Sequence, residues 1–139
     1  MAERILIVDD EPDMLKLLSM ILREKTSYAI TTTNNPLEAV DLAQKEGFDL
    51  VISDLKMPGL DGIELIDAIK KVNEDIPIII MTAYGTVESA TEAIQKGGFD
   101  FITKPFRKEQ ILFTLDKALK WLKVQRENKL LKEQLKKQE

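Results

Sequence analysis

The chain has 139 residues, enough for one domain with a buried core, and its 44% hydrophobic and 32% charged residues are typical of a globular protein. It has no cysteine and no histidine, which excludes disulfides, thiolate metal sites, cysteine nucleophiles and serine–histidine triads. Apolar runs are far shorter than the ~20 residues of a membrane helix. The first residues lack the pattern of a secretory signal, so we expect a cytoplasmic location.

The net charge of −4 is distributed unevenly along the chain. Residues 1–116 carry 12 basic and 21 acidic side chains, whereas residues 117–139 carry 8 basic and 3 acidic ones. The acidic part argues against nucleic-acid binding. The basic part could contact phosphate or acidic protein, but a solvated helix face is the commoner explanation of such lysines.

Short β-rich apolar runs alternate with longer amphipathic segments. The apolar runs predict five strands, at Arg4–Val8, Tyr28–Thr32, Asp49–Ser53, Pro77–Met81 and Phe99–Thr103. Helical spacing, capping residues and glycines predict helices over Pro12–Lys25, from Pro36 to a stop at Gly47, over Ile63–Val72, over Val87–Lys96 and from Lys108 onward. Strands that are apolar throughout are buried on both faces, so the chain is predicted to be an α/β protein with five βα units and a doubly wound parallel sheet.

The last predicted helix is unusually long, because no residue interrupts it before the end of the chain. Its first half offers five residues to the sheet, namely Ile111, Leu112, Leu115, Leu119 and Leu122. Its second half has a stripe at alternating steps of three and four, namely Trp121, Val124, Asn128, Leu131 and Leu135. This spacing is typical of a coiled-coil seam, and the alternative is a solvated tail. Residues 121–139 are therefore interpreted as a helical linker or a possible coiled coil.

Polar side chains follow four of the predicted strands. They are Asp9 and Asp10, then Asp54, Thr82 and Lys104. Carboxyl ends of parallel strands meet at one edge of a sheet, where ligands bind. Each residue alone is better explained as a cap or a turn residue, but three clustered carboxylates repel one another unless a cation lies among them. Because Mg²⁺ prefers carboxylate oxygens together with water and phosphate, we expect a Mg²⁺ site at this edge.

This set of residues can support phosphoryl transfer. An aspartate can attack phosphorus to form an acyl phosphate, and Asp54 is best placed because it lies on the central strand. The charge on the transferred group requires cations and donors around it. Mg²⁺, the Lys104 ammonium and the Thr82 hydroxyl or a backbone N–H could provide them.

The sequence closely resembles the receiver domain of two-component response regulators. The matching segments, in order, are ILIVDDEP, DLVISDLKMPGLDG, PIIIMTA and DFITKPF, which begin at Ile5, Asp49, Pro77 and Asp100. The resemblance implies a receiver domain over residues 1–120 with the flavodoxin-like strand order 2-1-3-4-5. Residues 82–106 further resemble the nitrogen-regulation and dicarboxylate-regulation type activators, in which a receiver precedes an ATPase domain that works on sigma-54 RNA polymerase.

The resemblance also implies roles for the residues at the strand ends. Asp54 would be the phosphoacceptor, and Asp10 would bind Mg²⁺ with Asp54 and the backbone carbonyl of Lys56. Asp9 would support the metal through water. Thr82 would contact the phosphoryl group, Lys104 would pair with it, and the peptide bond before Pro105 is expected to be cis.

Four residues correspond to positions that tune the response. Phe101 takes the aromatic switch position and would move into space near Ala83, although it lacks the hydroxyl of the tyrosine that many members have. Lys56 and Tyr84, two residues beyond Asp54 and Thr82, would set the lifetime of the phosphoryl group.

The implied function is to accept a phosphoryl group from the phosphohistidine of a sensor histidine kinase, without acting as a turnover enzyme. Expected partners are that kinase, a second copy of the chain, and ATPase and DNA-binding output domains. A stand-alone phosphorelay or interaction receiver is an alternative. An aspartate-based phosphatase is less favoured, because Lys56 stands where such enzymes usually have an acid/base aspartate. A flavodoxin-like cofactor binder would need a phosphate-binding loop that the sequence does not resemble.

Overall fold

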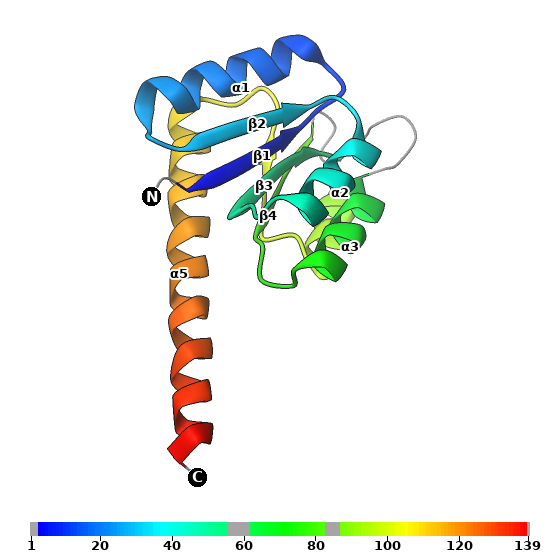
Figure 1. Cartoon of the computed structure of the whole chain (residues 1–139). Helices are drawn as coiled ribbons and strands as arrows, with labels where there is room; N and C mark the ends of the chain where they lie inside the picture. The colour runs from blue at the N-terminus through cyan, green and yellow to red at the C-terminus, as the bar shows by residue number, and fades with distance from the viewer. Residues whose placement is uncertain (1–2, 56–61, 83–86, 139) are drawn as a thin grey trace.

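The computed structural model of the chain describes residues 3–55, 62–82 and 87–138, in which strands and helices alternate (Figure 1). The strands are β1 (Arg4–Val8), β2 (Ala29–Thr33), β3 (Leu50–Asp54), β4 (Ile78–Thr82) and β5 (Asp100–Thr103). The helices are α1 (Pro12–Lys25), α2 (Pro36–Lys45), α3 (Gly62–Val72), α4 (Val87–Gln95) and α5 (Lys108–Gln138). Every predicted element is present, and the strand bounds differ from the predicted ones by no more than one residue.

The strands form one parallel sheet in the order β2-β1-β3-β4-β5, as expected. The central strand β3 pairs with β1 on one side and with β4 on the other, so that Ile52 lies between Ile7 and Ile79. In the same register Asp54, the last residue of β3, lies beside Met81. The acceptor predicted from the sequence is therefore at the carboxyl end of the middle strand.

Helices cover both faces of the sheet. Alternate strand residues point to opposite faces, which is why each strand supplies two cores. One core lies under α2, α3 and α4 and includes Leu6, Val51, Ile78, Ile80, Ala39, Leu65, Ile66 and Ala93. The other lies under α1 and α5 and includes Ile7, Ile52, Ile79, Leu18, Leu22, Ile111, Leu115 and Ala118. The prediction of a sheet buried on both faces is confirmed.

The ends of the helices follow the predicted signals with one exception. The Asn35 side chain caps α2 by accepting a hydrogen bond from the backbone N–H of Leu37 at 2.9 Å. Gly97 follows α4 with a φ of 122°, a left-handed conformation that favours glycine. The predicted stop of α2 is in place, because the helix ends at Lys45 with Glu46 as its C-cap and Gly47 follows directly; the exception is that Gly47 lacks the left-handed conformation.

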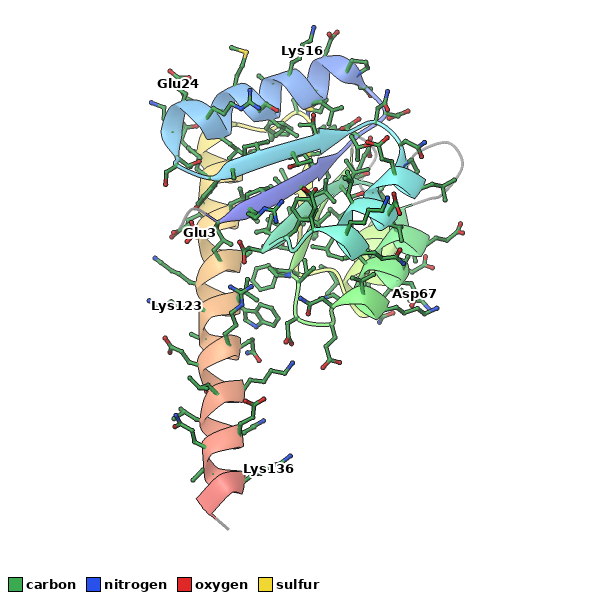
Figure 2. All side chains as sticks on the ribbon, in the orientation of Figure 1. Glu3, Lys16, Glu24, Asp67, Lys123 and Lys136 are labelled. Carbon is green, nitrogen blue, oxygen red and sulfur yellow. The ribbon has the colours of Figure 1, made fainter. Side chains whose placement is uncertain are left out.

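The long helix α5 is bound to the sheet in its first half, and its carboxyl-terminal end extends beyond the sheet (Figure 1). Lys136 lies on the part that extends past the sheet (Figure 2). Trp121, which we placed on the seam, instead lies half-buried against Phe99 of its own domain, with ring centroids 5.4 Å apart. The other seam residues, Val124, Asn128, Leu131 and Leu135, are exposed. Among the described residues, no helix is both long and apolar enough to cross a membrane.

Candidate functional site

The carboxyl edge of the sheet collects the polar residues that follow the strands. Asp9 comes directly after β1, Asp54 and Thr82 end β3 and β4, and Lys104 comes directly after β5. Asp9, Asp54 and Thr82 are 0, 7 and 2% exposed, although polar side chains of this kind are usually at the surface. The parallel topology therefore brings together four residues that are up to 95 positions apart in the chain.

Lys104 joins two of the carboxylates. Its ammonium nitrogen Nζ lies 3.1 Å from Oδ2 of Asp9 and 3.2 Å from Oδ2 of Asp54. Its backbone N–H donates to the carbonyl of Thr82 at 2.8 Å, which holds the lysine beside the end of β4. The peptide bond between Lys104 and Pro105 is cis, as the resemblance implied. The side chain is only 10% exposed, so this positive charge is fixed next to Asp54.

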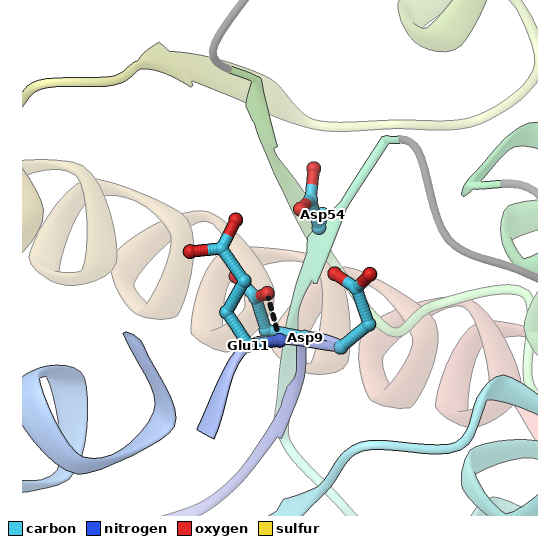
Figure 3. Close-up of side chains that lie close together, drawn as sticks. Asp9, Glu11 and Asp54 are labelled. Carbon is cyan, nitrogen blue, oxygen red and sulfur yellow. Dashed lines mark hydrogen bonds between the residues drawn. The ribbon is translucent and has the colours of Figure 1, made fainter. Parts of the chain in front are cut away.

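Four carboxylates lie close together at this edge of the sheet. Asp9, Asp10, Glu11 and Asp54 each offer an oxygen, and these oxygens all lie within 4.8 Å of one another. Figure 3 shows Asp9, Glu11 and Asp54, with the hydrogen bond of 2.9 Å from the backbone N–H of Glu11 to Oδ1 of Asp9. Four neighbouring acidic groups carry more negative charge than the one ammonium bound to Asp9 and Asp54 can balance, and hard oxygen ligands with such a charge suit a divalent cation such as Mg²⁺.

Burial and charge shift the ionisation of two of these groups. Burial raises the pKa of Asp9 above its usual range, although the Glu11 N–H and the Lys104 ammonium act in the opposite direction. Burial alone would lower the pKa of Lys104, but the attraction of Asp54 and Asp9 outweighs it, so that this pKa is raised. Lys104 therefore remains an ammonium at neutral pH and stabilises negative charge at Asp54.

Glu11 was missing from the residues predicted for this site. It becomes part of the cluster because α1 begins at Pro12, directly after it, and Asp9 binds its backbone N–H. Asp10 is not a helix cap, because Glu11 occupies the N-cap position of α1. The run of three acidic residues before Pro12 was the sequence signal for this part of the site. Which of these three side chains reach Asp54 depends on where α1 begins.

The other predicted residues lie apart from this cluster or outside the described chain. Phe101 is on β5 with 42% of its surface exposed. Lys56, Ala83 and Tyr84 lie outside the described residues. Their parts in metal binding, switching and phosphate lifetime stay predictions.

Comparison with known proteins agrees with this geometry. Residues 5–116 match the response regulator receiver domain. The transcriptional regulatory protein GlrR of Escherichia coli (strain K12) is 41% identical over 115 residues, which cover 83% of this chain and 26% of GlrR. The chain thus spans about a quarter of the length of this relative.

Solved structures give the same result. The crystal structure of NtrX from Brucella abortus in complex with ADP has a TM-score of 0.88 and 34% identity, covering 94% of this chain and 30% of that one. The beryllofluoride-activated NtrC4 receiver domain dimer has a TM-score of 0.81 and 36% identity, covering 86% of this chain and 98% of that one. The resemblance to receivers, and among them to those of nitrogen-regulation type regulators, is confirmed. With its matched sequence, its strand order and its acidic edge around Asp54 and Lys104, this chain belongs to the response regulator receiver domain family.

Proposed function

We propose that this receiver accepts a phosphoryl group on Asp54 from the phosphohistidine of a sensor histidine kinase. The observation that carries the proposal is the Lys104 ammonium, which lies 3.2 Å from the Asp54 carboxylate within a cluster of acidic side chains. A carboxylate oxygen of Asp54 attacks phosphorus while the bond from phosphorus to the histidine nitrogen breaks, which gives an acyl phosphate on Asp54. The chain assists its own phosphorylation and slow dephosphorylation, and it is not a turnover enzyme.

The residues around Asp54 stabilise the transferred group. Lys104 neutralises one phosphoryl oxygen, and Thr82 at the end of β4 contacts another. Asp10 and Asp54, with the backbone carbonyl of Lys56, would hold Mg²⁺, and Asp9 would support it through water. Bound Mg²⁺ supplies the additional positive charge that phosphoryl transfer needs. Lys56 and Tyr84 then control how readily water reaches the phosphorus.

The test is labelling of the full chain by acetyl phosphate, followed by intact mass spectrometry. We expect one phosphoryl group per chain with Mg²⁺ present, and none when EDTA removes the metal. The acyl phosphate should also be lost on mild alkaline treatment, unlike a phosphoserine. Labelling that survives EDTA, or a label that resists alkali, would contradict the proposal.

Asp10→Asn should weaken Mg²⁺ binding by about tenfold or more, because it removes a charged ligand. In EDTA the same change should raise the free energy of unfolding by up to about 1 kcal/mol, because the cluster loses one of its repelling carboxylates. Urea unfolding with and without Mg²⁺ measures both effects. Asp13→Asn is the control, since Asp13 is an exposed residue in the first turn of α1. Loss of the Asp13 charge should lower stability slightly, because a negative charge near the start of a helix interacts favourably with the helix dipole. If Asp10→Asn and Asp13→Asn change stability equally, repulsion within the acidic cluster is not the cause.

We further propose that the complete protein carries an ATPase and a DNA-binding domain after α5, and activates sigma-54-dependent transcription in the cytoplasm. Two observations support this output. The similar proteins include NtrX and NtrC4, and α5 continues to Gln138, beyond the part that matches the receiver family. Phosphorylation would act on this output by moving Phe101 and Ala83, and so altering the faces of β5 and α5.

The exposed stripe on α5 predicts that the chain forms a two-fold homodimer of micromolar strength. Leu131 and Leu135 are 56 and 62% exposed, and a second copy would bury them in a short parallel coiled coil, with Asn128 setting the register. Sedimentation should show a monomer for Leu131→Asp/Leu135→Asp and for a chain truncated after Lys120. Leu37→Asp on α2, where Leu37 is 64% exposed, is the matched control and should leave the dimer intact. Parent and variants that sediment alike would rule out the seam.

A further inference from the structure

The amino-terminal edge of the sheet, opposite the acidic site, contacts the middle of α5, from Trp121 to Lys129. Arg126 Nη2 lies 2.8 Å from Oδ1 of Asp49, the residue just before β3. One turn further on, Lys129 Nζ lies 2.6 Å from Oδ2 of Asp75, in the loop before β4. Five residues before Arg126, the Trp121 ring lies against Phe99, the residue just before β5. Three segments that enter the sheet at this edge thus each contact α5.

The two acidic partners are themselves held by the domain. Asp49 accepts the backbone N–H of Arg4 on its other oxygen at 2.7 Å, and its own N–H donates to the Arg4 carbonyl at 2.8 Å. The loop of Asp75 is fixed by Lys70, whose Nζ donates to the carbonyls of Glu74 and Ile76 at 3.1 and 2.6 Å. With 22 and 29% of their side chains exposed, Asp49 and Asp75 are anchored and partly desolvated.

The contacts also fix how α5 is rotated about its axis. Arg126 and Lys129 follow Leu122 at steps of four and three, so they continue the face that packs on the sheet. Val124, Leu131 and Leu135 fall on the opposite face and are 51, 56 and 62% exposed. A helix held by Arg126 and Lys129 therefore turns its apolar stripe away from its own domain.

We propose that Arg126 and Lys129, bound to Asp49 and Asp75, form a charged clamp that makes α5 one rigid body with the sheet as far as Lys129. The clamp sets the direction and the rotation in which the rest of α5 leaves the domain. A single exposed ion pair has little effect on its own. Here two pairs to anchored carboxylates and one aromatic contact act on consecutive turns of the same helix. The inference does not depend on phosphoryl transfer.

Amide hydrogen exchange of residues 123–132 in the full chain tests the clamp. Arg126→Gln/Lys129→Gln removes both ion pairs and keeps long side chains of similar helix propensity. We expect roughly tenfold faster exchange in this segment and unchanged exchange in β3. The matched control is Lys123→Gln/Lys132→Gln, which removes the same charge from exposed positions of the same helix and should change exchange less than about twofold. In 1 M NaCl, where the Debye length is ~3 Å, the parent should approach the first variant.

A charge exchange shows whether the pairing itself is responsible. Lys129→Asp alone should accelerate exchange, and adding Asp75→Lys should restore most of the protection. Each variant is measured at two protein concentrations tenfold apart. Equal exchange in the two Gln variants, or a charge exchange that restores nothing, overturns the clamp. A further outcome is protection that rises with protein concentration and is the same in the two double Gln variants. That result would show that self-association orders α5, and it would also overturn the clamp.

Discussion

Asp54→Asn should abolish labelling by acetyl phosphate and binding of beryllofluoride in the presence of Mg²⁺. The amide keeps the size of the side chain but removes the nucleophilic oxygen and one negative ligand. The fold should survive, because Lys104 keeps its ion pair of 3.1 Å with Asp9. The free energy of unfolding should change by no more than about 1 kcal/mol, since the lost attraction to Lys104 is offset by relief of repulsion in the cluster. Intact mass and urea unfolding measure the two effects.

Asp41→Asn provides the control for this experiment. Asp41 is on α2, exposed, and paired with Lys45 at 3.0 Å, so its loss changes the charge equally without touching the site. It should label like the parent. An Asp54→Asn protein that still gains a phosphoryl group would identify another acceptor, and peptide mapping would then distinguish Asp10 from Glu11, the acidic neighbours that the structure places within reach.

Most of the fold was predictable from local sequence. Unbroken apolar runs such as Ile78–Met81 occur where a strand is covered on both sides, and this alone indicates a parallel sheet between helices. The convergence of Asp9, Asp54 and Lys104 followed from one rule, that parallel strands end at the same edge. The strand order came from the resemblance to receivers, because periodicity does not say which strands are neighbours.

The contacts of α5 were not predictable in this way. Arg126 and Asp49 are 77 residues apart, and Lys129 and Asp75 are 54 apart, so no local spacing signals that they meet. In the sequence, nothing distinguishes Arg126 and Lys129 from the neighbouring lysines that are exposed to solvent. Trp121 fits the heptad spacing as well as the other seam residues do. Only its contact with Phe99 shows that the Trp121 ring packs within the domain. Long-range partners of a surface helix depend on how the helix is placed, which is a property of the whole fold.

Gly62→Ala should lower the free energy of unfolding by about 2–3 kcal/mol. Gly62 begins α3, and its N–H donates to the carbonyl of Leu55 at 2.8 Å. A Cβ at this position would lie 2.7 Å from the Cα of Leu55 and 2.9 Å from the carbonyl oxygen of Asp54. These neighbours are backbone atoms that cannot rotate away, so either the start of α3 or the end of β3 must move. Because β3 carries Asp54, the acceptor that we propose, labelling should also become slower.

Helix propensity alone predicts the opposite sign, since alanine is more favourable than glycine in a helix by up to about 1 kcal/mol. Gly47→Ala separates the two effects. Apart from Gly47 and its two chain neighbours, no atom lies within 4 Å of a Cβ built on Gly47, and its φ is not positive, so this change should leave stability within about 0.5 kcal/mol or raise it slightly. Urea unfolding of both variants measures the stability effect, provided that the free energy of unfolding depends on urea concentration with the same slope in each. The rate of labelling by acetyl phosphate measures the effect on Asp54. If Gly62→Ala behaves like Gly47→Ala in both measurements, the backbone at Asp54 has room to move, and close packing of α3 is not what holds the acceptor in place.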